Sequence, residues 1–121
     1  MSNTATPAPI HLSTALIVKN EAAKLEACLQ SLAGWVDEIV IIDSGSSDAT
    51  LDIARKYSAK IHSYTDWQGF GMQRQRAQSH VQGAWVMWLD ADERVTPELK
   101  QSLQAALNQY RDQKNVIFEF N

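Results

Sequence analysis

Short apolar runs alternate along this chain with segments whose apolar residues recur at helical spacing, and this alternation restricts the possible folds more than any other feature. It occurs four times, which favours right-handed β-α-β units and a parallel sheet between helical layers. The expected strands cover residues 12–18, 39–42, 60–64 and 85–89, with a fifth at 116–121. The sequence therefore predicts an α/β fold.

The expected helices carry start and stop signals. Gly34 is placed to end the first helix, and Ser47 or Asp48 to cap the second. A third helix, rich in Gln and Arg, is expected over residues 70–82. Thr96 begins the fourth as a cap, followed by a proline in the first turn and an acid near the positive end of the helix. Together these helices predict a Rossmann-like sheet with helices on both faces.

Composition excludes several classes of function. A chain of 121 residues is one domain in length and buries roughly two-thirds of its unfolded surface. Its net charge of -3 lacks the basic character that nucleic acid requires, so we expect no nucleic-acid partner. The single cysteine, Cys28, excludes an internal disulfide framework and a multi-cysteine zinc site, and it fits a reducing compartment. We expect Cys28 to be part of the core.

The two ends of the chain suggest its organisation. Residues 1–11 are small and polar, without the features of a secretory signal, and are expected to be a flexible tail. Residues 12–121 form the expected domain, incomplete at the C-terminus because the last apolar strand stops with the chain; such a strand favours self-association. No apolar run approaches the ~18 residues of a transmembrane segment. The expected location is the cytoplasm, with the cytoplasmic face of the inner membrane as the alternative that stays open.

An acidic pair follows the fourth expected strand. Asp90 and Asp92 come directly after the apolar residues 85–89. Ligands of parallel sheets bind beyond the carboxyl ends of the strands, and paired carboxylates suit a hard divalent cation. The spacing alone is a weak signal, but its place at a strand end favours a metal site.

A second acid, Asp43, ends the second expected strand. Because neighbouring strand ends face one crevice, the three acids suit a nucleotide diphosphate. Asp43 could accept hydrogen bonds from a base or ribose, while a cation at Asp92 neutralises phosphate oxygens. The alternative is that residues 43–48 form only a capped turn that begins the next helix.

Two arginines and one tryptophan are further candidates. Arg74 and Arg76 precede the acidic strand, where a cation could balance the charge of a diphosphate; a solvated helix face is the alternative. Trp67 lies in an expected loop and is the best aromatic candidate for contacting a sugar.

Several blocks, taken in order, resemble glycosyltransferase family 2, the inverting enzymes of GT-A fold. The blocks are residues 15–21, 37–50 and 89–94, and the resemblance covers about residues 12–110. Within the family, residues 18–21, 67–71 and 90–97 look most like bacterial glucosyltransferases that extend the lipopolysaccharide inner core.

The resemblance implies a UDP-sugar donor, a glycan or lipopolysaccharide-core acceptor, and single displacement assisted by Mn²⁺ or Mg²⁺. It implies that Asp92 coordinates the metal, and that Asp90 contacts the ribose or donor sugar, often through the ion. It places the general base beyond residue 121. The other residues that it assigns to the nucleotide-sugar are Val18, Lys19, Asn20, Glu21, Asp43, Ser44 and Arg74.

Other classes with the same architecture fit less well. A phosphorelay receiver domain would carry an acidic cluster where this chain has Lys19, Asn20 and Glu21. A dinucleotide-binding domain would carry G-x-G-x-x-G after the first strand, and the chain has none there. The main alternative is a non-catalytic α/β interaction module.

Overall fold

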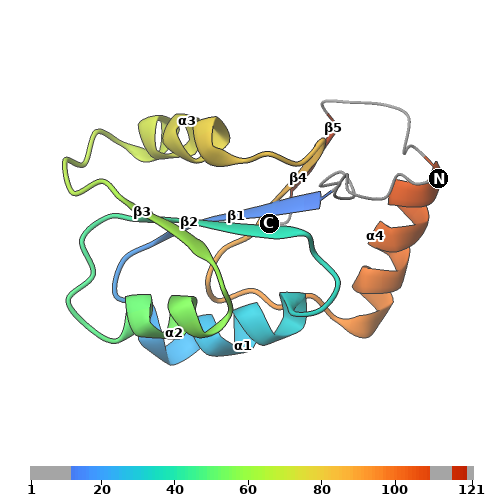
Figure 1. Cartoon of the computed structure of the whole chain (residues 1–121), viewed down its shortest axis with the longest axis horizontal. Coiled ribbons are helices and arrows are strands. Elements are labelled where there is room, and N and C mark those ends of the chain that lie inside the picture. The colour runs from blue at the N-terminus through green and yellow to red at the C-terminus, as the bar shows by residue number, and fades with distance from the viewer. Residues whose placement is uncertain (1–11, 110–115, 120–121) are drawn as a thin grey trace, which may run out of the picture.

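The computed structural model describes residues 12–109 and 116–119, which form one sheet and four helices (Figure 1). The expected tail, residues 1–11, lies outside the described residues. The elements are, in order, β1 (Leu12–Val18), α1 (Ala22–Leu32), β2 (Glu38–Asp43), α2 (Thr50–Lys56), β3 (Lys60–Ser63), α3 (Phe70–His80), β4 (Trp85–Trp88), α4 (Pro97–Gln109) and β5 (Val116–Glu119).

The five described strands form one parallel sheet in the order β3-β2-β1-β4-β5, as the alternation predicts. The strand order reverses at β1, since β2 and β3 lie on one side of it and β4 and β5 on the other. Val18 pairs with Asp43 at the carboxyl ends of β1 and β2. In an open α/β sheet such a reversal leaves a crevice where ligands bind.

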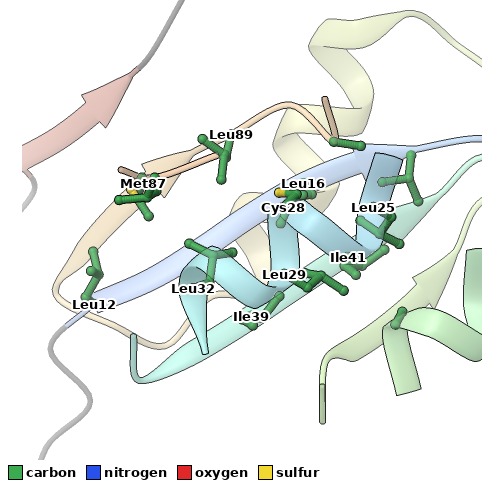
Figure 2. Close-up of a cluster of buried hydrophobic side chains, with 14 of the residues drawn as sticks. Leu12, Leu16, Leu25, Cys28, Leu29, Leu32, Ile39, Ile41, Met87 and Leu89 are labelled. Atoms are coloured by element: carbon green, nitrogen blue, oxygen red, sulfur yellow. The ribbon is translucent and has the colours of Figure 1, made fainter. Parts of the chain in front are cut away.

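Helices cover both faces of the sheet, as predicted (Figure 1). The larger core lies beneath α1, α2 and α4, and Figure 2 shows its centre, where leucines of α1 pack against β1 and β2. On the opposite face, α3 packs Ala77 against a smaller cluster that includes Val40 and Val86. The α1 side chains in the larger core are Leu25, Cys28, Leu29 and Leu32.

Most of the expected helix ends are confirmed. Gly34 follows α1 with φ of 87°, a left-handed conformation that glycine adopts without steric cost. The predicted cap of α2 is displaced, because the N-cap residue is Ala49, which makes no side-chain cap hydrogen bond. Asp48, one residue earlier, accepts the backbone N–H of Thr50 at 2.9 Å. Thr96 Oγ1 accepts the N–H of Leu99 at 3.1 Å and so caps α4.

The third helix ends two residues before the predicted position. It stops at His80, and Val81 is extended. Gln82 then donates its backbone N–H to Glu38 Oε1 at 2.8 Å. This hydrogen bond to β2 holds Gln82 outside the helix. In the part of the chain from 12 to 109, no helix has the length and apolar character that a membrane crossing needs.

Candidate functional site

A pocket of about 420 Å³ opens at the carboxyl ends of β1 and β2, beside the first turn of α3. Four of the predicted nucleotide-binding residues line it, and four further residues complete its wall. The predicted residues are Val18, Lys19, Glu21 and Ser44, and the others are Ile17, Thr65, Trp67 and Phe70. Among the latter, only Trp67 was singled out from the sequence.

Asn20 supports the pocket without lining it. It adopts a left-handed φ of 53°, and its Oδ1 accepts the backbone N–H of Ser47 at 2.7 Å. Its own N–H donates to Ser46 Oγ at 2.9 Å, and the N–H of Glu21 donates to Thr50 Oγ1 at 2.9 Å. The loop after β1 is thus joined to the loop after β2, which fixes the backbone on both sides of Asn20.

Asp43 is buried, and its carboxylate faces the turn that follows β2. Its oxygens accept the backbone N–H of Gly45 at 3.1 Å and that of Ser46 at 3.1 Å, and also the Ser46 hydroxyl. Gly45 has φ of 119°, which favours glycine in this tight turn. These are the contacts of a capped turn, and Asp43 does not line the pocket. The predicted contact of Asp43 with a base or ribose stays a prediction.

A buried glutamine joins the pocket to α3. Gln73 is fully buried, and its Nε2 donates to Ser44 Oγ at 2.8 Å. Its Oε1 accepts from Arg76 Nη1 at 2.8 Å, and Arg76 Nη2 pairs with Asp66 Oδ2 at 2.9 Å. The Arg76 hydrogen bond holds the pKa of Asp66 below its usual range. Arg76 therefore orders the loop before α3, and Gln73 is a residue that the sequence did not reveal.

Arg74 lies beside the end of β4. Its guanidinium carbon is 4.5 Å from the centroid of the Trp88 ring, an arrangement typical of a cation–π contact. Trp88 is the last residue of β4 and stands two positions before Asp90. The structure thus brings Arg74 close to the strand that leads into the acidic turn, although Arg74 does not line the pocket.

The acidic turn itself is compact and exposes both aspartates. Glu93 Oε1 accepts the backbone N–H of Asp90 at 2.7 Å, and the Glu93 N–H donates to the Asp90 carbonyl at 3.0 Å. Cys28 Sγ lies 3.8 Å from the same carbonyl. Burial, together with the charges of Glu93, Asp92 and Asp90, raises the pKa of the Cys28 thiol to about 12. Cys28 is therefore a protonated core residue, as expected, beneath the turn.

The donor chemistry of this turn fits a hard cation that arrives with a phosphate ligand. Asp90 and Asp92 are exposed, while Glu93 is engaged with the backbone. Within the described residues, no three His, Cys, Asp or Glu side chains gather around a single ion. Mg²⁺ commonly binds proteins through one or two carboxylates and takes its other ligands from water and substrate phosphates. The pair is sufficient for such a site.

Comparison with known proteins gives the family. Residues 13–117 match the family model described as glycosyl transferase family 2. The chain is 36% identical over 96 residues to the lipopolysaccharide core biosynthesis glycosyltransferase LpsC of Rhizobium meliloti, covering 76% of this chain and 35% of LpsC. It is 30% identical over 108 residues to an uncharacterized glycosyltransferase of Rickettsia felis, covering 89% of this chain and 38% of that protein. The chain thus spans little more than a third of the length of these relatives.

Solved structures show the same fold. TarS of S. aureus superimposes with a TM-score of 0.72 at 23% identity, over 84% of this chain and 33% of the TarS chain. Glucosyl-3-phosphoglycerate synthase of Mycobacterium tuberculosis, solved with Mn²⁺, UDP and glucosyl-3-phosphoglycerate, gives a TM-score of 0.59 at 26% identity, over 69% of this chain and 35% of that one. These similarities confirm the GT-A fold that the resemblance implied. With a family match that covers most of its length, this chain belongs to glycosyl transferase family 2.

Proposed function

We propose that this chain binds a UDP-sugar together with Mn²⁺ or Mg²⁺, and that it forms the donor-binding part of an inverting glycosyltransferase. One observation carries the proposal: the pocket and the acidic turn flank the carboxyl end of β1, where the strand order reverses. A ligand with a flat base at one end and a diphosphate at the other would span these two places. The synthase structure with UDP and Mn²⁺ supports this choice of ligand.

The pocket residues would hold the uridine. Val18 offers apolar contact, and Ser44 offers a hydroxyl whose position Gln73 sets. Lys19 and Glu21 add charged groups to the same wall. We assign Asn20 and Asp43 to this site chiefly through the loops that they fix, because their side-chain oxygens accept hydrogen bonds from those loops.

The diphosphate would lie towards β4. Asp92 and Asp90 would hold the divalent cation, which when bound neutralises negative charge on the departing diphosphate. Arg74, which lies in α3 beside Trp88 at the end of β4, would add a second positive charge near the acidic turn. Both groups would lie where charge grows during departure of the diphosphate, and would therefore favour the transition state over the bound substrate.

The donor sugar, the acceptor and the location are proposed from the family and its members. We propose glucose as the donor sugar and a glycan, such as the lipopolysaccharide core, as the acceptor; the similarity to LpsC supports the acceptor class. We assign the general base to no residue of this chain. Action in the cytoplasm, at the cytoplasmic face of the inner membrane, would agree with a nucleotide-sugar donor, and self-association remains part of the proposal.

Calorimetric titration with UDP tests the site. Wild-type protein should bind UDP more tightly with Mn²⁺ than with a chelator, and Asp92→Asn should remove that difference. Asp52→Asn is the matched control, because Asp52 is an exposed carboxylate whose partner is Arg55, within α2. Unchanged Mn²⁺-dependent affinity in Asp92→Asn would contradict the metal assignment. Absence of any UDP binding by wild-type protein would instead favour the non-catalytic interaction module.

A further inference from the structure

Two large aromatic side chains are exposed at the pocket. Trp67 is 51% and Phe70 is 68% accessible to solvent, although both belong to the pocket wall. Their ring centroids are 4.8 Å apart and their planes are at 89°, an edge-to-face pair. Exposed apolar surface at the mouth of a cavity indicates a binding surface. Neither ring is needed to fill the core, which leaves a ligand as the reason for their position.

The loop that carries the pair is held in place. Asp66, next to Trp67, pairs with Arg76 at 2.9 Å, and Gln68 Nε2 donates to the same carboxylate at 3.1 Å. Gly69 has φ of 95°, a conformation that side chains other than glycine's adopt with strain. Gly69 is the N-cap residue of α3, so this conformation sets the start of the helix between the two rings. A surface held in this way loses little conformational freedom on binding, which favours affinity.

The order of the strands decides which part of the ligand meets this pair. The Trp67 loop follows β3, whereas the acidic turn follows β4, and β2 and β1 lie between them. Three steps of about 4.8 Å separate β3 from β4, or about 14 Å across the sheet. If the diphosphate lies at the acidic turn, as the proposed function requires, the sugar beyond it is still farther from Trp67. The base is at the end of the ligand that reaches β3.

From this geometry we infer that Trp67 and Phe70 form a stacking platform for the uracil base of the donor nucleotide. This inference rests on the proposed function and replaces the sugar contact that the sequence suggested for Trp67. A base offers a flat π-face, and stacking on an aromatic side chain depends little on hydrogen bonding. The hydroxyl of Ser44, in the same wall, adds a polar group that a base edge could meet.

Binding of three ligands distinguishes this platform from the alternatives. Affinities for uridine without metal, and for UDP and UDP-glucose with Mn²⁺, are measured for wild type, Trp67→Ala, Trp67→Phe and Phe70→Ala. We expect Trp67→Ala to weaken all three by a similar factor, about tenfold, because all three share the base. Trp67→Phe should keep most of the affinity because it keeps a ring. Both side chains are exposed, so the variants should unfold at the wild-type urea concentration.

Fluorescence gives a second readout of the same contact. Uridine should protect Trp67 from quenching by acrylamide, and this protection should be absent from Trp67→Phe. Trp35→Phe is the control, because Trp35 packs against the larger core on the other side of the sheet and should leave the protection unchanged.

The possible failures are separable. If wild type binds UDP with Mn²⁺ and Trp67→Ala binds it equally well, the platform is refuted and the proposed function stands. If Trp67→Ala weakens UDP-glucose alone, Trp67 contacts the sugar and the platform is again refuted. If wild type binds neither UDP nor uridine, the proposed function fails first and the platform with it.

Discussion

Gln73 Nε2 donates a hydrogen bond of 2.8 Å to Ser44 Oγ, and this contact joins α3 to the turn after β2. The same amide group accepts from Arg76, which in turn pairs with Asp66. A fully buried glutamine thus links the floor of the pocket to the loop that carries Trp67. Because buried polar groups are costly when unpaired, this chain of contacts fixes both walls of the pocket relative to each other.

Replacement of Gln73 by leucine should therefore destabilise the protein. The change leaves the buried side of Arg76 and the Ser44 hydroxyl without a partner, at a cost of about 1–3 kcal/mol in the free energy of unfolding. Urea denaturation measures this loss. Gln78→Leu, at an exposed position of the same helix, should change the free energy by less than about 0.5 kcal/mol. Equal stability of the two variants would show that the buried contacts contribute nothing.

Arg74 should matter for the diphosphate and not for the base. Arg74→Ala should weaken UDP binding by about tenfold or more, because charge-assisted hydrogen bonds are worth about 1.5–3 kcal/mol. It should leave uridine binding unchanged, since uridine carries no phosphate. Arg55→Ala, which removes an exposed arginine paired with Asp52, serves as the control for net charge. A parallel loss of uridine and UDP affinity would place Arg74 near the base instead.

The alternation was enough to predict the parallel sheet and its helices, because each apolar run is long enough for one strand and three of the four helical segments between and after them carry a cap or a terminating glycine. The end of α3 was not predictable, since it depends on the hydrogen bond from Gln82 to Glu38, 44 residues away in sequence. The burial of Glu38 is likewise explained only by contacts with residues that are distant in the sequence. It pairs with Lys60 at 2.6 Å and accepts from Ser13 at 2.6 Å.

The candidate site was predictable in part, by resemblance. The likeness to glycosyltransferase family 2 assigned Val18, Lys19, Glu21 and Ser44 to the nucleotide-sugar, and the structure places all four in one pocket. Gln73 could not be predicted, because nothing in a helix rich in Gln and Arg marks the one glutamine that is buried. The role of Asn20 depends on side-chain direction, which sequence spacing does not give. For Asp43, the capped turn over residues 43–48 was one of the two alternatives, and its contacts are those of that turn.

Gly83 should not tolerate a side chain. A Cβ at this position would lie 2.6 Å from Ser13 Oγ and 2.8 Å from the Ser13 backbone nitrogen. Because Gly83 also donates its N–H to Ser13 Oγ at 2.8 Å, the neighbour has no room to move away. We expect Gly83→Ala to lower the free energy of unfolding by about 1–3 kcal/mol.

Gly71→Ala provides a control of opposite sign for that substitution. A Cβ at Gly71 meets nothing within 4 Å, and the residue lies in α3. Alanine should therefore raise the free energy of unfolding by up to about 1 kcal/mol, because glycine loses more conformational freedom in a helix. Urea denaturation of both variants checks the pair. Stabilisation by Gly83→Ala would contradict the close packing of β1 against the start of β4.

The stacked rings of His62 and His80 should make stability depend on pH. Their centroids are 3.6 Å apart and their planes differ by 7°, and Tyr64 Oη is 2.8 Å from His80 Nε2. Burial, followed by the charges of His80 and Lys60, lowers the pKa of His62 below its ordinary value of 6.5. As pH falls below about 6.5, the unfolded chain therefore binds a proton that the folded protein resists. The free energy of unfolding should decrease through that window, and the decrease should end below the folded pKa.

His62→Phe keeps a flat ring but cannot titrate, so it should lose less stability than wild type between about pH 7.5 and about pH 5.5. Urea denaturation at the two pH values measures the difference, and equal losses in the two proteins would show that the stack does not resist protonation.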